Sequence, residues 1–294
     1  MAEPIDGGWE LRVGETSVTI EPELGGRISS VRLGGREWLH QPTSPRRPAR
    51  PFDPFVRPDL AGWDEMVPTC VPVRFDGVDL PDHGEVWARS WAAVERPDGG
   101  SDLRDSLGLE VACDSTTIRV RRVARLGPDR LDLDYELTNE GSVVSAAFWM
   151  AHPLFDATDL VDVALSPTPI SVVRTYSDSD EPDASPRYLP REIPDGGFRK
   201  YRIGGGDAVR AVRLMASDGT ELTMTWRAPV PIFTQIWVDS GAVGTGPVVA
   251  PEPAIAWGDD PVSARTAGAL PLLAPGETLA FSLRVSARAP SVRF

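Results

Sequence analysis

The chain carries three histidines, His40, His83 and His152, and each is a candidate for proton transfer near neutral pH. His152 follows the apolar run 148–151 and precedes Pro153, which favours an extended backbone at the histidine. We therefore expect an imidazole at the end of a buried strand. It would be either a catalytic group at the mouth of a β core or a structural histidine with one satisfied hydrogen bond.

His83 stands in a turn whose sequence predicts a following aromatic-rich strand with Trp87 and Trp91. Tryptophan faces give a large contact area of specific geometry, which suits stacking on the apolar side of a sugar ring. A ligand-facing histidine followed by Trp and Arg89 is one interpretation, and a turn histidine beside core tryptophans is the alternative. His40 opens a segment rich in Pro and Arg, and we expect a structural role for it.

Glu252 differs in its setting from the many other carboxylates, most of which we expect at the solvated surface. It lies between Pro251 and Pro253, after the apolar run 248–250. Two prolines restrict the backbone on both sides, so a carboxylate placed after a strand here can be aimed into a cleft. The alternative is an exposed glutamate at the end of an edge strand.

The elements that must position these residues are strands, because apolar and polar residues alternate along much of the chain. The clearest runs are 17–21, 117–121, 130–137 and 279–285. Alternation with period two places one face on a core and the other in water. The chain has 27 glycines and 29 prolines, many in turn-forming pairs, and no amphipathic helix of 12 residues or more is indicated. The pattern predicts an all-β fold, a large antiparallel β-sandwich.

Residues 1–294 are expected to form a single domain, with irregular insertions near 41–58 and 177–194. The first insertion is rich in Pro and Arg, and the second in Asp, Ser and Pro. Both are interpreted as solvated surface insertions or as a rim over a ligand site, since long loops in compact β domains are often functional.

The formal net charge of -13 argues against nucleic acid or an anionic membrane surface as the main partner, but not against a neutral ligand. Cys70 and Cys113 are too few for a disulfide scaffold and lack the neighbours of a Cys/His zinc site. Residues 1–8 lack the basic start and apolar run of a signal peptide, and no apolar stretch reaches transmembrane length. We expect a cytoplasmic protein with no metal site.

The order of five segments along the chain carries a resemblance to a known family. The segments are Thr19-Ile20-Glu21-Pro22-Glu23-Leu24-Gly25-Gly26-Arg27-Ile28-Ser29-Ser30-Val31, then 62–69 (GWDEMVPT), His83-Gly84, His152-Pro153-Leu154-Phe155-Asp156 and Glu252-Pro253. In this order they resemble the aldose 1-epimerase, or galactose mutarotase-like, superfamily over nearly the whole chain. The chain departs from the family pattern at Asp156, where Asn is common, and by the two residues between Gly84 and Trp87.

The resemblance implies a large twisted antiparallel β-sandwich with a sugar bound on its concave sheet. It also implies a mutarotase mechanism, which interconverts α and β anomers of a free or phosphorylated aldose without cofactor. His152 would protonate the ring oxygen as general acid. Glu252 would accept the proton of the anomeric hydroxyl as general base.

The resemblance further implies that His83 holds a sugar hydroxyl or the ring oxygen. Arg27 and Arg89 would bind hydroxyls, or a phosphate if the sugar carries one, because arginine offers a bidentate fork. Asp64 and Trp237 would line the cleft. Asp195, at a loosely matching position, is a further candidate for the family's substrate-holding carboxylate.

Two other functions stay open at this level. One is a non-catalytic carbohydrate-binding protein on the same fold. The other is a different sugar chemistry on this scaffold, such as a lyase or a hydrolase accessory domain. A lyase needs a Tyr or Lys base near the site. The chain has four Tyr and one Lys, none of them in the five segments that carry the resemblance. Neither the identity of the sugar nor the oligomeric state is indicated by the sequence.

Overall fold

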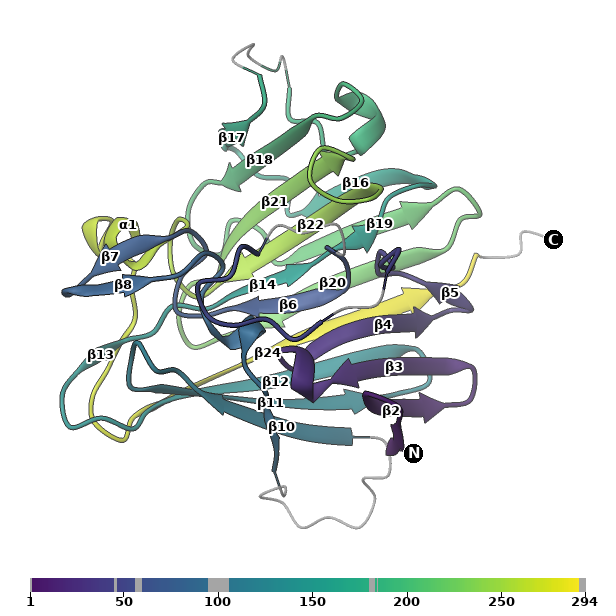
Figure 1. Cartoon of the computed structure of the whole chain (residues 1–294). Helices are drawn as coiled ribbons and strands as arrows, with labels where there is room; N and C mark the ends of the chain where they lie inside the picture. Colours follow the sequence, from purple (N-terminus) through teal and green to yellow (C-terminus); the bar gives the residue numbers. More distant parts are fainter. Residues whose placement is uncertain are drawn as a thin grey trace.

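A computed structural model describes residues 2–44, 47–55, 60–94, 106–179, 183 and 185–290. Within them, two large antiparallel sheets face each other and enclose the main core (Figure 1). The predicted all-β antiparallel sandwich is therefore confirmed.

The first sheet has twelve strands, and its central strands carry the residues discussed below. Ten of them follow one another across the sheet in the order β1 (Ala2–Ile5), β2 (Gly8–Val13), β3 (Thr16–Glu21), β4 (Arg27–Leu33), β6 (Trp63–Met66), β14 (Met150–Pro153), β22 (Pro247–Ala254), β21 (Phe233–Ser240), β18 (Phe198–Ile203) and β17 (Val172–Ser177). The short β5 (Arg36–Glu37) pairs with β4, and β15 (Phe155–Asp156) pairs with β22.

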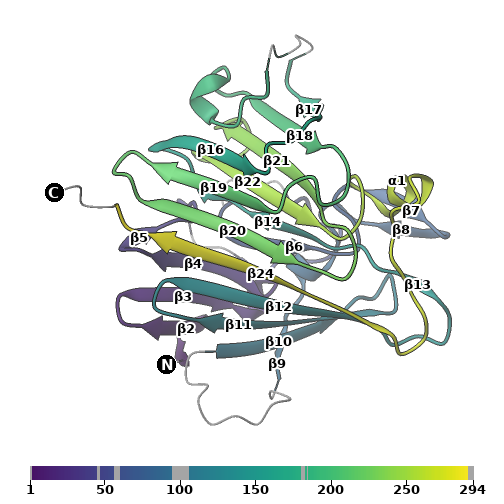
Figure 2. The same ribbon diagram turned by 180° about the vertical axis from the view of Figure 1, so that it is seen from behind.

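The second sheet has eight strands and lies nearer the viewer in Figure 2. Its order is β16 (Leu160–Ser166), β19 (Ala211–Ala216), β20 (Glu221–Arg227), β24 (Thr278–Arg288), β12 (Arg130–Asn139), β11 (Ile118–Leu126), β10 (Ser106–Ala112) and β9 (Ala92–Ala93). Three of the predicted alternating runs, 117–121, 130–137 and 279–285, form β11, β12 and β24 here, while 17–21 lies in β3 of the first sheet.

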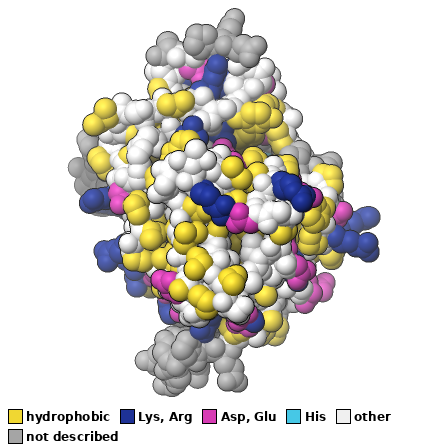
Figure 3. All heavy atoms as spheres, turned by 90° about the vertical axis from the view of Figure 1, so that its left-hand side faces the viewer, with side chains coloured by type: hydrophobic (Ala, Val, Ile, Leu, Met, Phe, Trp, Pro, Cys, Tyr) yellow, Lys and Arg dark blue, Asp and Glu magenta, His cyan; other side chains and the backbone are white. Residues whose placement is uncertain are grey.

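The remaining elements are short. Two small two-stranded sheets remain. One is the hairpin of β7 (Val73–Phe75) and β8 (Val78–Leu80), and the other pairs β13 (Ser145–Ala146) with the distant β23 (Leu272–Leu273). Three single 3-10 turns are η1 (Pro22–Leu24), η2 (Val86–Ala88) and η3 (Pro190–Glu192). Among the described residues the only α-helix is α1 (Pro261–Thr266), which is too short to cross a membrane. On the face that carries β7, β8 and α1, hydrophobic side chains are scattered among charged ones (Figure 3).

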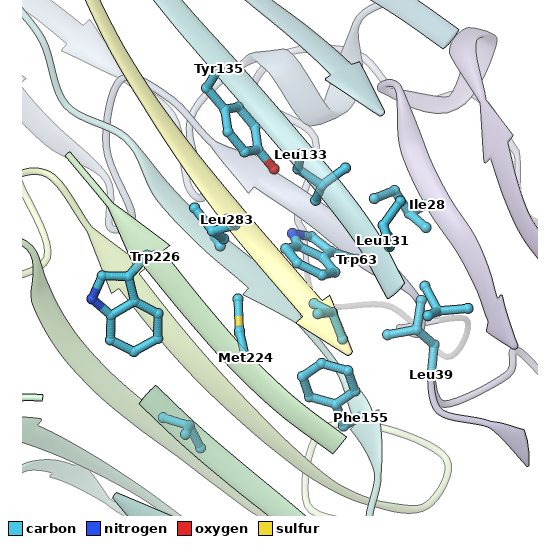
Figure 4. Packing of buried hydrophobic residues seen from close by; sticks show 14 of the residues in the cluster. Ile28, Leu39, Trp63, Leu131, Leu133, Tyr135, Phe155, Met224, Trp226 and Leu283 are labelled. Atoms are coloured by element: carbon cyan, nitrogen blue, oxygen red, sulfur yellow. The ribbon is translucent and has the colours of Figure 1, made fainter. Parts of the chain in front are cut away.

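Strand β12 shows how the alternation builds the core. Leu131, Leu133, Tyr135 and Leu137 are buried, while the residues between them are partly exposed. These side chains meet the inner faces of the neighbouring strands and of the twelve-stranded sheet, including Trp63 (Figure 4). Each fully buried side chain of this size contributes about 1.5–3 kcal/mol by leaving water.

One ion pair lies inside this core. Glu65 on β6 is fully buried and accepts hydrogen bonds from Arg122 (2.9 Å), from the Tyr135 hydroxyl (2.8 Å) and from the Trp149 indole (2.9 Å). Burial raises the pKa of Glu65, and the nearby Arg122 cation opposes that rise. The carboxylate ties the two sheets together because its partners come from β11, β12 and the approach to β14.

Both expected insertions are described in part by the structure. The described residues of 41–58, which are 41–44 and 47–55, form neither helix nor strand, and residues 45–46 and 56–58 lie outside the described part. This segment crosses the outer face of the twelve-stranded sheet (Figure 1). The segment 177–194 leaves the end of β17 and contains η3, with residues 180–182 and 184 outside the described part.

Candidate active site

The residues of interest lie in one row across the outer face of the twelve-stranded sheet. His152 on β14 pairs with Asp64 on β6, and Gln235 on β21 pairs with Glu252 on β22. The pairing of Met150 with Ala254, continued by two residues, sets His152 opposite Glu252. Because side chains alternate along a strand, these four side chains share the face that points away from the sandwich core.

His152 and Glu252 are brought together by this register. The Nε2 atom of His152 lies 3.6 Å from Oε1 of Glu252, and the two residues are 5% and 2% exposed. Burial raises the pKa of Glu252, and the charge of Lys200 acts in the opposite direction. The sequence pointed to His152 and Glu252 as two candidates far apart in the chain, and the structure makes them neighbours.

Glu252 lies inside β22 rather than after a strand, so the expected position beyond the strand end is corrected. Residues of odd number on β22 point their backbone groups toward β14 and β15, as the bonds from Ala157 N to Pro247 O and from Ile255 N to Trp149 O show. Pro251 and Pro253 have no N–H to donate on that side. The two prolines are tolerated because β22 pairs continuously with β21 and only sparsely with β14.

Lys200 on β18 completes the charge arrangement around Glu252. Its Nζ atom lies 3.0 Å from Oε2 of Glu252 and 2.7 Å from Oδ1 of Asp259. Gln235 donates to the same Asp259 oxygen at 3.0 Å. Sequence reasoning missed Lys200, although its being the only lysine of the chain was a usable signal.

The backbone of Asp259 connects this cluster to the turn that bears His83. The Asp259 carbonyl accepts from the amides of Cys70 (2.9 Å) and Val71 (3.1 Å). The Cys70 carbonyl in turn accepts from the amide of His83 at 2.8 Å. These backbone hydrogen bonds hold the His83 turn in a defined position relative to the segment that follows β22. They therefore help to set the distance between His83 and Glu252.

His83 and Gly84 both have left-handed backbone conformations, with φ of 57° and 71°. A Cβ on Gly84 would lie 2.1 Å from the carbonyl oxygen of Val67, so only glycine fits against β6 here. The His83 imidazole reaches Asp82 Oδ1 at 2.9 Å and lies 5.2 Å from the His152 ring, between centroids. The histidine of the expected His-Gly turn therefore faces the His152–Glu252 pair.

The segment after Gly84 is a 3-10 turn, η2, and the expected aromatic-rich strand is wrong. The left-handed residues curl the chain, and the indole N–H of Trp87 closes the turn on the Gly84 carbonyl at 2.9 Å. The indole N–H of Trp91 donates a hydrogen bond to the Val86 carbonyl at 3.0 Å. Local side-chain hydrogen bonds thus replace a strand ladder in this segment.

Phe55, from the expected insertion 41–58, covers both histidines. Its ring stacks on His83 at 3.8 Å between centroids with an interplanar angle of 7°. It meets the rings of His152 (5.4 Å) and Trp87 (4.9 Å) edge-on, and it is only 2% exposed. Sequence reasoning missed Phe55, and an aromatic residue within a Pro/Arg-rich segment was the available signal.

Arg27 and Asp64 extend the row toward β4. The Nη2 atom of Arg27 lies 3.3 Å from Oδ2 of Asp64, and both side chains are almost completely buried. A cavity of about 530 Å³ opens beside Arg27 and is lined also by Ser29, Gln41 and Gly62. Asp64 is thus a neighbour of His152 in the sheet, and Arg27 joins it to this cavity.

Trp237 lies on the same outer face, where it pairs across the sheet with Lys200 and with Ala250. It packs against the buried cluster that contains Phe55 and stacks on Phe198 at 5.0 Å between centroids.

Arg89 and Asp195 are placed differently. Arg89 forms ion pairs with Asp114 and, at 3.8 Å, with Glu85, so it ties its segment to the 113–116 turn. Asp195 lies in an exposed turn before β18.

His40 is held by contacts that join two segments of the chain, as expected for a structural histidine. Its Nε2 atom is 3.0 Å from the Thr245 hydroxyl, and its Nδ1 atom is 3.6 Å from Oδ2 of Asp156. Burial acts to raise the pKa of Asp156, but hydrogen bonds with His40 and Thr158 outweigh it and lower that pKa to about 2. His40 thus joins the end of β15 to the 241–246 loop.

Within the described ranges, no group of three or more His, Cys, Asp or Glu side chains is arranged to hold a metal ion. The chemistry that these residues can perform is proton transfer, between an imidazole, a buried carboxylate and a bound molecule with exchangeable protons.

Comparison with known proteins identifies structures of the same fold. No family model and no curated protein matches the chain by sequence. Solved structures do match over nearly its whole length. The Slr1438 protein from Synechocystis sp. PCC 6803 superposes with a TM-score of 0.73 at 12% identity, covering 98% of this chain and 96% of its own.

Two further matches carry informative names. A galactose mutarotase-like protein from Lactobacillus casei matches with a TM-score of 0.68 at 14% identity, covering 96% of this chain and all (100%) of its own. The galactose mutarotase-related enzyme from Lactobacillus acidophilus matches with a TM-score of 0.65 at 13% identity, over 97% and 99%. The chain has the galactose mutarotase-like fold. At these identities the galactose mutarotase-like neighbours establish the architecture, and the resemblance seen in the sequence is confirmed at that level.

Proposed function

We propose that this protein is an aldose 1-epimerase-like enzyme that interconverts the α and β anomers of an aldose. The observation that carries the proposal is the pair of His152 and Glu252, 3.6 Å apart on the outer face of the sheet. The galactose mutarotase-like fold and the order of the sequence segments support it.

The reaction needs one group that holds a proton and one that accepts it. His152, when protonated, gives a proton to the ring oxygen while Glu252 takes the proton of the anomeric hydroxyl. The bond between the anomeric carbon and the ring oxygen breaks, and an open-chain aldehyde forms. Rotation about the C1–C2 bond and reclosure with both transfers reversed give the other anomer, with no net change in protons.

The short distance between the two groups suits this chemistry. The ring oxygen and the anomeric hydroxyl are bonded to the same carbon, so their partners must also lie close together. A sugar would therefore lie over the pair, where His83 is in reach, instead of between the two side chains. In this arrangement the ring of Phe55 occupies part of the space over the histidines, so a sugar can bind there only if the ring moves.

The charges on this face favour a neutral aldose. Two cations of the row lie beside carboxylates, Arg27 beside Asp64 and Lys200 beside Glu252 and Asp259. A third, Arg202, is the residue opposite Gln235, and it stacks on the Trp257 ring at 4.0 Å. A phosphate would have to compete with those carboxylates. We propose a free aldose as substrate, with Asp64 and Trp237 as lining residues.

The test is the decay of optical rotation of freshly dissolved α-glucose and α-galactose, with the corresponding 6-phosphates as a second panel. We expect the wild type to accelerate the decay for a free aldose. His152→Ala and Glu252→Gln are each expected to reduce the catalysed rate by about 10²–10⁴-fold. His40→Ala is the matched histidine control and should retain the wild-type rate.

Two outcomes would change the proposal. Full activity in His152→Ala would remove His152 from the mechanism. Sugar binding measured by calorimetry, with no mutarotation of any aldose in a broad panel, would make the protein a carbohydrate-binding protein on this fold.

A further inference from the structure

Lys200 is the only lysine of the chain, and it is buried beside the proposed base. Three polar atoms surround its ammonium group: Oδ1 of Asp259 at 2.7 Å, Oε2 of Glu252 at 3.0 Å and Sγ of Cys70 at 3.6 Å. Burying a charged ammonium costs free energy unless the charge is paired. We therefore attribute a role to the contacts of the Lys200 ammonium group and not to the packing of its apolar stem.

The two oxygens of Glu252 face different partners. Oε1 lies toward His152, and Oε2 lies against Lys200. A carboxylate anchored through one oxygen keeps the other in a defined direction. The anchor itself is held, because Asp259 binds Lys200 from the far side and is oriented by Gln235.

We propose that Lys200 is a positioning residue for Glu252, which keeps the buried carboxylate ionised and directs Oε1 toward the substrate. The inference rests on the proposed function, in which Glu252 is the base.

The charged and titratable groups that face Glu252 come from several elements. They are His152 from β14, His83 from its turn, Lys200 from β18, Asp259 from the segment between β22 and α1, and Cys70 from the 69–71 turn. Burial raises the pKa of Glu252; the Lys200 charge lowers it and the Asp259 charge raises it. Burial also raises the Cys70 pKa, so its thiol adds no negative charge near neutral pH.

Lys200 itself remains a cation. Burial acts to lower its pKa, but the surrounding groups outweigh burial and hold that pKa well above its ordinary value. A protonated amine cannot attack the open-chain aldehyde, so a Schiff base at Lys200 is not expected. The lysine acts through Glu252.

The experiment compares pH–rate profiles of mutarotation for wild type, Lys200→Met and Asp259→Asn. Loss of an opposite charge within a few ångströms raises a carboxyl pKa by about 1–3 units. The acid-side inflection of kcat/KM should therefore move to higher pH in Lys200→Met. Each unit of that shift lowers the rate on the acid side about tenfold.

Asp259→Asn provides a control in which the inflection is expected to shift in the opposite direction. Removing the Asp259 charge leaves Glu252 as the carboxylate beside Lys200 and takes away a negative charge near Glu252, so the inflection should move to lower pH. Lys200→Arg keeps the cation and should keep the inflection close to that of wild type. A merely structural role would lower the rates of Lys200→Met and Asp259→Asn without moving their inflections in opposite directions. That result would overturn the inference. An unmoved inflection in Lys200→Met would overturn it as well. If Lys200→Met does not fold, an unmoved inflection in Asp259→Asn overturns it in the same way.

A second measurement separates this inference from the proposed function. Carboxyl carbon NMR of glutamate-labelled protein follows Glu252 directly, with its signal assigned by its loss in Glu252→Gln. If wild type lacks mutarotation but the Glu252 titration moves upward in Lys200→Met, the proposed function fails, and the effect of Lys200 on the ionisation of Glu252 stands. If mutarotation occurs and neither titration nor inflection moves, only the Lys200 inference fails.

Discussion

Phe55 is the residue that most directly limits access to the two histidines of the site. Its ring stacks face to face on His83 and meets His152 edge-on, and almost none of it is exposed. Its neighbour in the same segment, Phe52, is 66% exposed. The same segment thus holds one aromatic ring on the site and another in solvent, which makes the pair a natural comparison.

We predict that Phe55→Ala exposes His83 and His152 and speeds their modification by diethyl pyrocarbonate several-fold. The physical reason is that the ring shields both imidazoles from solvent. Mass spectrometry of peptides after timed exposure measures each histidine separately. Phe52→Ala should leave all three rates unchanged, and His40, bound to Thr245, serves as the internal reference. Equal rates in Phe55→Ala and wild type would show that the ring does not cover the histidines in solution.

At the scale of elements, the site depends on two local departures from regular sheet. The prolines beside Glu252 leave β22 sparsely paired with β14, just where His152 and Glu252 face each other. The left-handed turn at His83 and Gly84 brings a third segment onto this face through the bridge between Val67 and Gly84. The amide of His83 donates to the Cys70 carbonyl, and the amide of Cys70 donates to the Asp259 carbonyl, so the turn is also tied to the segment that follows β22.

We predict that Gly84→Ala destabilises the protein and impairs sugar turnover, whereas Gly14→Ala has a smaller effect on stability alone. Both glycines have positive φ, which costs an L-residue about 1–2 kcal/mol. Only at Gly84 does a Cβ also collide with backbone, since the space around Gly14 is open. Urea unfolding and mutarotation rates check this, with Gly84→Ala losing at least twice the free energy of unfolding lost by Gly14→Ala. Similar losses in both variants would contradict the close approach to Val67.

At the scale of the whole molecule, the twelve-stranded sheet presents different chemistry on its two faces. One strand, β6, shows this in consecutive residues: Asp64 faces outward to His152, and Glu65 faces inward to Arg122. The inward ion pair lies between the sheets and is fully buried. It connects the sheet that bears the site to the sheet that supports it.

We predict that Arg122→Met lowers the free energy of unfolding by about 3–5 kcal/mol, because it leaves Glu65 charged and unpaired in the core. The matched surface variant is Arg265→Met. It removes an exposed pair with Asp76 and should cost less than about 1 kcal/mol. Denaturant unfolding of both proteins gives the two values. A loss in Arg122→Met as small as that in Arg265→Met would mean that Glu65 is protonated or otherwise satisfied in the folded protein.

The sequence by itself determined the strands, because a period of two residues assigns each side chain to one face whatever the neighbouring strand. It also singled out His152, His83 and Glu252, through residue type, proline neighbours and their order along the chain. It misjudged the segment after Gly84, where indole hydrogen bonds to nearby carbonyls outweigh strand propensity.

Only the tertiary structure decided which charges meet. Lys200 reaches Glu252 because β21 holds β18 and β22 in one register, a relation between strands distant in sequence. Arg89 was expected at the sugar and instead forms ion pairs with Asp114 and Glu85. Phe55 lies on the histidines although its own segment has no regular structure. Pairings of this kind depend on long-range register and packing, which local patterns do not encode.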